Sequence, residues 1–426
     1  MPSAGRGFPG WALGSAGILL GGLLALLAVP GRILVPAVTA GGDAPRWLMG
    51  VFGDGLGYAG ERYLQILLAA IAVWAVFVYA LGGRELRAGD GVARALWILI
   101  AVLIGLFALA PPLHSLDVFS YISYARLDGV ADLNPYEYAP ASIFNDPAAS
   151  RVEDFRFTVS AYGPLFTLLT LPLGSGSVGL ALWTLKGISA LAVGAIALLT
   201  ARIARTRGVP EVQAAAFVAL NPLTLVHVVG GAHNDALMVA LALAGVLGVL
   251  SATPRLGGAL LVAAAAVKAS AAVYAPFAAL AQGSRARVLT GMAGAAIAVG
   301  LVGLAAFGPS VTEALAVIGD NQRTVSYWSV PATLSRITGI DIDAVRAAAL
   351  AIYGFAVVWL LIWTARGGDW VRAAGWATFG LLVATAWMVP WYLIWVLPLA
   401  AVSRDRVLIG GTVLLTLLQA ANGIAT

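Results

Sequence analysis

Residues 95–117 read ALWILIAVLIGLFALAPPLHSLD, an apolar run that ends at two prolines and reaches an acid five residues later. The run Ala95–Ala110 predicts a membrane-spanning helix, and the prolines end it because proline lacks a hydrogen-bond donor. An ionisable group placed where an apolar helix leaves the bilayer is by default a hypothesis for a functional site. Asp117 is therefore the first candidate residue.

The whole chain has the composition of an integral membrane protein. It is 61% hydrophobic and 11% charged, whereas soluble proteins carry roughly 25% charged residues. Apolar runs long enough for a helical span recur from end to end, without the alternation of a membrane β-barrel. We expect an all-α polytopic fold with roughly 11–13 transmembrane helices. The lack of cysteine excludes thiol chemistry, and nothing in the chain indicates nucleic-acid binding.

The expected spans follow these apolar runs, and the first of them is read as an uncleaved helix. Leu256–Leu280 has an arginine near each end and Lys268 in its middle, so we expect two half-helices, which line cavities in membrane proteins. Tyr162–Leu173 is too short to cross, so we expect it to lie at the interface or to re-enter the membrane from the outer side. Twelve segments are expected to span or enter the membrane: Trp11–Val29, Arg62–Leu81, Ala95–Ala110, Val178–Ala201, Gln213–Val229, Ala236–Leu250, Leu256–Leu280, Val288–Phe307, Ala344–Trp363, Val371–Val389, Trp391–Val402 and Val407–Gln419.

The distribution of charge predicts the orientation of the chain. Fourteen arginines and five acids lie in the N-terminal segment and the short connections, against nine arginines and 15 acids in the long loops. Because short cytoplasmic loops are rich in Arg and Lys, we expect a multi-pass cell-membrane protein with its N-terminus in the cytoplasm. The loop Leu113–Tyr162 is then extracytoplasmic. The fourteen are Arg6, Arg84, Arg87, Arg94, Arg202, Arg205, Arg207, Arg255, Arg285, Arg287, Arg366, Arg372, Arg404 and Arg406.

Asp117 begins a segment that can form a helix along the membrane surface. Asp117, Tyr121 and Tyr124 would then share one face. Burial beside these phenols is expected to raise the pKa of Asp117, so that it could take a proton from a sugar hydroxyl. The alternative is an interfacial acid that caps a helix or pairs with Arg126.

A second polar group, His227-Val228-Val229-Gly230-Gly231-Ala232-His233-Asn234-Asp235, joins two expected spans. The preceding Asn221-Pro222 breaks a helix. His233, Asn234 and Asp235 can hydrogen-bond to a sugar or a phosphate. The alternatives are that Asn234 or Asp235 caps the next helix, or that His233 and Asp235 bind a divalent cation with a third ligand from elsewhere. A cation is compatible with this spacing but is not indicated by it.

The two lysines of the chain fall within apolar segments, where an unpaired charge costs several kcal/mol. Lys268 can pair with an internal acid or with an anionic lipid headgroup. Because acids are scarce in the expected spans, the lipid phosphate is the preferred partner. Lys186 faces the same choice, and we expect it to extend its amine to the interface.

The outer loop Gly308–Asp343 contains two further candidates. Arg323 can bind a phosphate, and Trp328 can stack on a sugar ring, although tryptophans such as Trp328 and Trp391 are also common membrane-interface anchors. No P-loop and no strand-linked GxGxxG occurs in the sequence. A group donor, if there is one, is therefore expected in the membrane.

These features together resemble the GT-C superfamily of polytopic glycosyltransferases. The chain most resembles the actinobacterial polyprenol-phosphate-mannose-dependent α-1,6-mannosyltransferases of lipomannan and lipoarabinomannan assembly. The resemblance covers roughly residues 113–395. It rests on Leu116-Asp117-Val118-Phe119-Ser120-Tyr121, Leu133-Asn134-Pro135-Tyr136, Tyr162-Gly163-Pro164-Leu165, Asn221-Pro222-Leu223, His233-Asn234-Asp235-Ala236-Leu237-Met238 and Lys268.

The resemblance implies an extracytoplasmic, inverting transferase that moves mannose from polyprenyl-phosphate-mannose to a glycolipid or mannan acceptor. One transmembrane domain, 1–426, would comprise an extra N-terminal helix pair, 1–94, and a GT-C-like catalytic core, 95–426. Asp117 would be the general base, and Lys268, Arg323 or His233 would stabilise the leaving phosphate. The substrate contacts expected around the base are Tyr121, Tyr124, Arg126, Tyr162, His233, Asn234, Asp235, Lys268, Arg323 and Trp328.

Two other classes of protein share some of these features. A transporter or lipid-linked sugar flippase also has broken helices and a buried lysine, but it would need comparable gating loops on both faces. The short inner loops and long outer loops favour the enzyme. A polymerase or ligase of preassembled glycans would share the outer site and need a larger acceptor groove.

Overall fold

The computed structural model describes residues 10–29, 46–52, 56, 60–82, 90–153, 155–321 and 323–422. All regular elements within these ranges are helices, which confirms the expected all-α fold. The α-helices are α1 (Gly10–Ala28), α2 (Arg46–Met49), α3 (Gly60–Leu81), α4 (Gly91–Leu109), α5 (Asp117–Ala131), α6 (Pro164–Thr170), α7 (Val178–Thr206), α8 (Glu211–Ala219), α9 (Asp235–Leu250), α10 (Pro254–Val267), α11 (Ala275–Ala279), α12 (Arg285–Phe307), α13 (Glu313–Asn321), α14 (Val330–Thr338), α15 (Ile342–Ala365), α16 (Trp370–Ala384), α17 (Leu397–Val402) and α18 (Arg406–Leu418).

Six helical segments within the described ranges are long and apolar enough to cross a membrane: α1, α3, α4, α7, α12 with its continuation to Asn321, and α15. Five of the remaining expected spans coincide with shorter apolar helices, alone or in consecutive pairs, whereas Gln213–Val229 is divided between α8 and the π-helix η6 (Thr224–Val229). The chain is thus a polytopic membrane protein. Arg6, Arg84 and Arg87, on which the expected orientation partly rests, lie outside the described residues, and the orientation stays a prediction.

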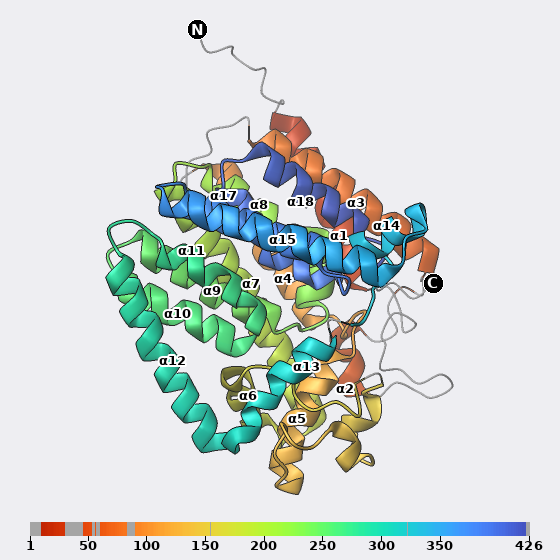
Figure 1. Ribbon diagram of the computed structural model, residues 1–426. Helices are drawn as coiled ribbons and strands as arrows, with labels where there is room; N and C mark the ends of the chain where they lie inside the picture. Colours follow the sequence, from red (N-terminus) through yellow and green to blue (C-terminus); the bar gives the residue numbers. More distant parts are fainter. Residues whose placement is uncertain are drawn as a thin grey trace.

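Two long helices bury only a small part of their surface. In Figure 1, α12 lies along one edge of the molecule and α15 crosses its front, and only 11% and 6% of their apolar windows are buried. Helices that are apolar on all sides and yet exposed are suited to a lipid environment. α5, α6 and the connection between them gather at the lower end of this view.

The segment Leu256–Leu280 is broken in its middle, as the sequence predicts. α10 ends at Val267, Lys268 is extended with φ −150° and ψ 123°, and the chain resumes as a 3-10 turn, η7 (Ala269–Tyr274), and α11. Gly163 packs directly against this break, because a Cβ there would overlap the Ala266 carbonyl oxygen. Only glycine lets the chain after Tyr162 approach the end of α10 so closely.

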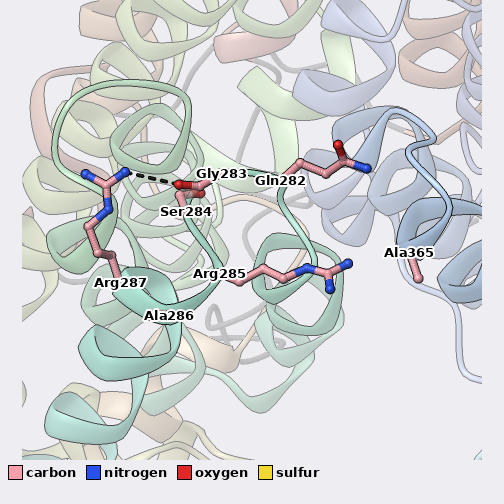
Figure 2. Close-up of a pocket in the computed structure, with 7 residues that line it drawn as sticks. All are labelled: Gln282, Gly283, Ser284, Arg285, Ala286, Arg287 and Ala365. Carbon is pink, nitrogen blue, oxygen red and sulfur yellow. Dashed lines mark hydrogen bonds between the residues drawn. The ribbon is translucent and has the colours of Figure 1, made fainter.

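A cavity of ≈ 510 Å³ lies at the α11–α12 turn, close to the end of α15 (Figure 2). Its lining consists of residues 282–287 and Ala365. Arg287 donates to the Gly283 carbonyl oxygen at 3.2 Å. The α11 end of the molecule is far from α5 in Figure 1, and this cavity is lined by none of the candidate site residues.

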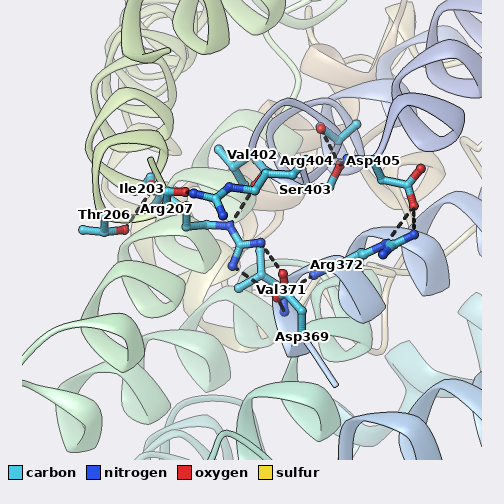
Figure 3. Close-up of polar contacts among 11 residues, drawn as sticks. Ile203, Thr206, Arg207, Asp369, Val371, Arg372, Val402, Ser403, Arg404 and Asp405 are labelled. Atoms are coloured by element: carbon cyan, nitrogen blue, oxygen red, sulfur yellow. Dashed lines mark hydrogen bonds and ion pairs between the residues drawn. The ribbon is translucent and has the colours of Figure 1, made fainter. Parts of the chain in front are cut away.

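Ion pairs join the helix ends after α7 and around the start of α16 (Figure 3). Arg207 pairs with Asp369, and Arg372 pairs with Asp405 at 2.7 Å. Asp369 and Asp405 also cap α16 and α18 by accepting bonds from backbone N–H groups. Arg404 donates to the Arg207 carbonyl oxygen. These contacts fix the ends of α7, α16 and α18 relative to one another.

Candidate active site

Asp117 lines a second cavity, of ≈ 320 Å³, between α5, the break after α10, and the chain from α16 to η9 (Pro390–Trp395). It is the first residue of α5, where the helix N-terminus favours a carboxylate. Its side chain keeps 23% of its surface exposed. Lys268 is the cation in the lining, and the aromatic residues there are Tyr124, Phe155, Tyr162, Trp387, Trp391, Tyr392 and Trp395.

His233 approaches Asp117 from a distant part of the chain. Its Nδ1 atom lies 3.3 Å from Oδ2 of Asp117, and its side chain is fully buried. The two segments are joined by a backbone hydrogen bond of 3.2 Å from Leu113 N to Gly230 O. His114 and Ala232 both have φ 57°, and such strain in non-glycine residues concentrates at functional sites.

The pKa of Asp117 differs from the sequence expectation. Burial alone raises the pKa of this carboxyl, but the contact and charge of His233, and then the charge of Lys268, outweigh it and hold the pKa below its usual value. The expected increase was therefore wrong, because both neighbours come from distant segments. Burial, followed by the charge of Asp117, raises the pKa of Tyr124, so Asp117 is the ionised group of the two.

Lys268 pairs with an internal acid. Its Nζ atom lies 2.9 and 2.8 Å from the two carboxylate oxygens of Asp235, whose side chain is fully buried. Trp395 donates its indole N–H to the same carboxylate at 2.6 Å. The preference for a lipid phosphate as the partner of Lys268 was thus wrong. The lysine side chain nevertheless keeps 16% exposure and lines the cavity, so it can still meet a ligand.

The segment 387–395 supplies the aromatic side of the cavity, and sequence reasoning missed its role. Trp391 stacks on His233 with a centroid distance of 3.8 Å, and Trp387 stacks on Phe155 at 5.9 Å. The sequence does contain an indication of this role, since four aromatic residues surround Pro390 in WMVPWYLIW. Its composition matches an interfacial aromatic belt, so only the fold distinguishes the two roles.

The expected tyrosines divide between the cavity and its support. Tyr124 and Tyr162 line the cavity, and Tyr124 donates to the Thr158 carbonyl oxygen at 2.8 Å. Tyr121 is buried outside the lining and donates to Oδ1 of Asn234 at 3.4 Å. Tyr121 therefore supports the His233 turn rather than the cavity wall.

The turn between η6 (Thr224–Val229, a π-helix) and α9 uses its polar side chains for contacts with other segments and does not cap α9. Asn234 makes no side-chain cap to α9. The carboxylate of Asp235 is occupied by Lys268 and Trp395. The capping alternative therefore does not hold for this pair.

Seven of the ten expected contact residues lie outside the cavity lining. Tyr121, His233, Asn234 and Asp235 are joined by contacts to one another or to lining residues, whereas the remaining three are Arg126, Arg323 and Trp328. Arg126 pairs with Asp146 at 2.6 Å and donates to the backbone carbonyls after η5 (Leu171–Leu173), so it holds the loop that follows α5. The side chain of Arg323 is 79% exposed. Trp328 accepts a hydrogen bond from Gln419 at its carbonyl. A ligand role for these three stays a prediction without support from the cavity.

The three histidines lie close together. His114 and His227 have ring centroids 5.4 Å apart, and His227 lies 6.3 Å from the ring of Trp391, on which His233 stacks. Within the described residues, no group of three or more acidic or histidine side chains is arranged to hold a metal ion. The arrangement instead combines an ionised carboxylate, a neighbouring imidazole, a cation and an aromatic wall.

Comparison with known proteins relates the chain to one protein family. The profile of a family described as "Alpha-(1->6)-mannopyranosyltransferase, N-terminal domain" matches residues 19–284. The chain is 28% identical over 371 residues to a Mycolicibacterium smegmatis protein named "Probable alpha-(1->6)-mannopyranosyltransferase", over 73% of this chain and 65% of that protein. It is 32% identical to alpha-(1->6)-mannopyranosyltransferase A of Mycobacterium tuberculosis, over 54% of this chain and 44% of that protein. Identity to the protein of the same name from Corynebacterium glutamicum is also 32%, over 44% of this chain and 38% of the relative.

The chain thus spans less than two thirds of the length of each of these relatives. No solved structure matches it. The family profile covers more than half of the chain, including α5, the His233 turn and Lys268. The chain belongs to the alpha-(1→6)-mannopyranosyltransferase family.

Proposed function

We propose that the protein is an inverting α-1,6-mannosyltransferase that moves mannose from polyprenyl-phosphate-mannose to a lipid-linked mannan or glycolipid acceptor. The reaction takes place on the extracytoplasmic face of the cell membrane. One observation carries the proposal: a single cavity of ≈ 320 Å³ is lined by Asp117, by Lys268 and by an aromatic wall. The names of the relatives support mannose and the α-1,6 linkage.

The residues of the cavity suit a single displacement. Asp117 takes the proton of an acceptor hydroxyl as the hydroxyl oxygen attacks C1 of the mannose. The bond from C1 to the phosphate oxygen breaks on the opposite face, and polyprenyl phosphate leaves with the electron pair. Asp117 then returns its proton to water.

A fixed cation stabilises the negative charge that develops on the leaving phosphate. Of the three candidates for this role, Lys268 lines the cavity, whereas Arg323 and His233 do not. This placement supports Lys268. The low pKa of Asp117 means that the base is ionised at neutral pH, as deprotonation of a hydroxyl requires.

Transfer in detergent distinguishes the enzyme from a transporter or flippase. Purified protein is given polyprenyl phosphate carrying labelled mannose or labelled arabinose, together with a mannan-lipid acceptor. We expect label from mannose in the acceptor, and none with Asp117→Asn. The matched control is Asp128→Asn, an exposed acid on the same helix. Absence of covalent transfer by the unaltered protein, or full transfer by Asp117→Asn, contradicts the proposal.

A further inference from the structure

Lys186 is fully buried in α7. Among the residues that the structure describes, no ion pair joins its amine to a carboxylate, and the ring of Trp183 lies 5.9 Å away. The sequence expectation that this amine reaches the interface was therefore wrong. Burying such a charge lowers the stability of the fold by several kcal/mol unless the charge is well paired. The contacts of the amine therefore indicate what the lysine is for.

The amine donates to backbone carbonyls at the end of η6. Lys186 Nζ lies 2.9 Å from Gly230 O and 3.4 Å from Val229 O. One turn further along α7, Ser189 Oγ donates to Val228 O at 2.8 Å. The last carbonyls of a helix have no partner within it, and two side chains of α7 satisfy three of them in succession.

Two of these carbonyls also accept a bond from the candidate active site. Val228 O accepts from the backbone N–H of His233 at 3.0 Å, in addition to Ser189. Gly230 O accepts from the backbone N–H of Leu113 at 3.2 Å, in addition to Lys186. Each carbonyl thus joins α7 to one of the two segments that carry Asp117 and His233.

The turn around these carbonyls has little freedom to adapt. Ala232 is held at φ 57°. A Cβ on Gly231 would lie 2.5 Å from the His227 carbonyl oxygen and 2.8 Å from the His233 ring. A small shift of Gly230 is therefore passed on to the His233 imidazole, which lies 3.3 Å from the Asp117 carboxylate.

We infer that Lys186, assisted by Ser189, is a positioning residue that holds the end of η6 and thereby sets the His233 imidazole against the Asp117 carboxylate. This inference rests on the proposed function for the role of Asp117. Lys186 acts through the backbone and lies outside the cavity lining.

Lys186→Met tests the inference, because it keeps an unbranched apolar chain out to the ε position and removes the amine. We expect an unfolding temperature no lower than that of the unaltered protein, since the cost of burying the charge disappears. We expect kcat to fall about ten- to hundredfold, as for a misplacement of about 1 Å, with KM nearly unchanged. The acid limb of the pH–rate profile should move to higher pH, because Asp117 loses part of the influence of His233.

Matched variants separate positioning from stability. Ser189→Ala should move the same acid limb in the same direction by a smaller amount. Thr200→Val is the control, since Thr200 is also buried in α7 and its hydroxyl has no hydrogen-bond partner among the described residues; it should behave as the unaltered protein. Combined with His233→Gln, Lys186→Met should add no further loss of kcat, because coupled residues are not additive.

Three results overturn the inference: an unchanged kcat in Lys186→Met, a loss that merely follows a lower unfolding temperature, or losses that multiply with His233→Gln. Amide hydrogen exchange tests the positioning role independently of the proposed transferase activity. Even if no mannose is transferred, Lys186→Met should speed exchange of the amides of residues 228–236, and Thr200→Val should not. Equal exchange in the two variants rejects the positioning role on its own.

Discussion

The Nδ1 atom of His233 lies 3.3 Å from Oδ2 of Asp117, which brings a buried imidazole against the proposed base. The carboxylate is largely withdrawn from solvent, yet its pKa stays below the usual value, because the contact and charge of His233 and the charge of Lys268 outweigh burial. The base is thus kept ionised by its neighbours. Asp117 is therefore a weaker base than a buried carboxylate without such neighbours would be, but a larger fraction of it is deprotonated at a given pH.

Loss of His233 should make activity more sensitive to acid. In His233→Gln, burial of Asp117 remains while the largest favourable contribution disappears, so the pKa of Asp117 should rise. Because the base acts in its deprotonated form, activity falls as pH drops through this pKa, and the acid limb of kcat/KM should move to higher pH. The measurement is the pH–rate profile of both proteins. An acid limb that does not move would show that His233 does not set the protonation of Asp117.

Lys268 should carry two separable functions. Lys268→Met leaves the carboxylate of Asp235 buried with Trp395 as its remaining partner among the described residues, and loss of one member of a buried pair costs about 3–5 kcal/mol. Adding Asp235→Asn removes the uncompensated charge. We expect the double variant to regain thermal stability without regaining kcat, because the cation for the leaving phosphate is still missing. Recovery of kcat would mean that Lys268 serves only to neutralise Asp235.

Local sequence pattern was sufficient for the fold class. Apolar runs predict the helices. The arginines near both ends of Leu256–Leu280 predict the break at Lys268, because a segment whose two ends lie on the same side of the membrane must turn within it. The polar segments around Asp117 and His233 were also recognisable, since each stands alone between apolar runs.

The pairings within the site could not be predicted in the same way. Lys268 with Asp235, and Asp117 with His233, join residues far apart in sequence, and nothing in either local segment specifies its partner. The expected rise in the pKa of Asp117 failed for this reason. The aromatic segment 387–395 was missed because an interfacial belt and a ligand-binding wall have the same composition.

Trp391, rather than Trp328, should contact the sugar. Trp391 lines the cavity and stacks on His233 at 3.8 Å, whereas Trp328 lies outside the lining. A lost aromatic contact is worth about 0.5–1.5 kcal/mol, so Trp391→Ala should raise KM for the mannose donor roughly two- to twelvefold. Trp391→Phe should lose less, because it keeps a ring. Trp328→Ala is the comparison, and an equal or larger effect there would place the sugar elsewhere.

The side of the membrane that the cavity faces can be tested directly, because the chain contains no cysteine. Phe144, in the connection between α5 and α6, is 62% exposed, and Arg287 lies at the distant α11–α12 turn. The arginine-rich short connections predict that this turn is cytoplasmic. In intact cells, a membrane-impermeant maleimide should therefore label Phe144→Cys, and it should label Arg287→Cys only after permeabilisation. Both variants should react in detergent, and the cysteine-free parent should not. The reverse pattern would put Asp117 on the side of the nucleotide sugars and remove the reason for a lipid-linked donor.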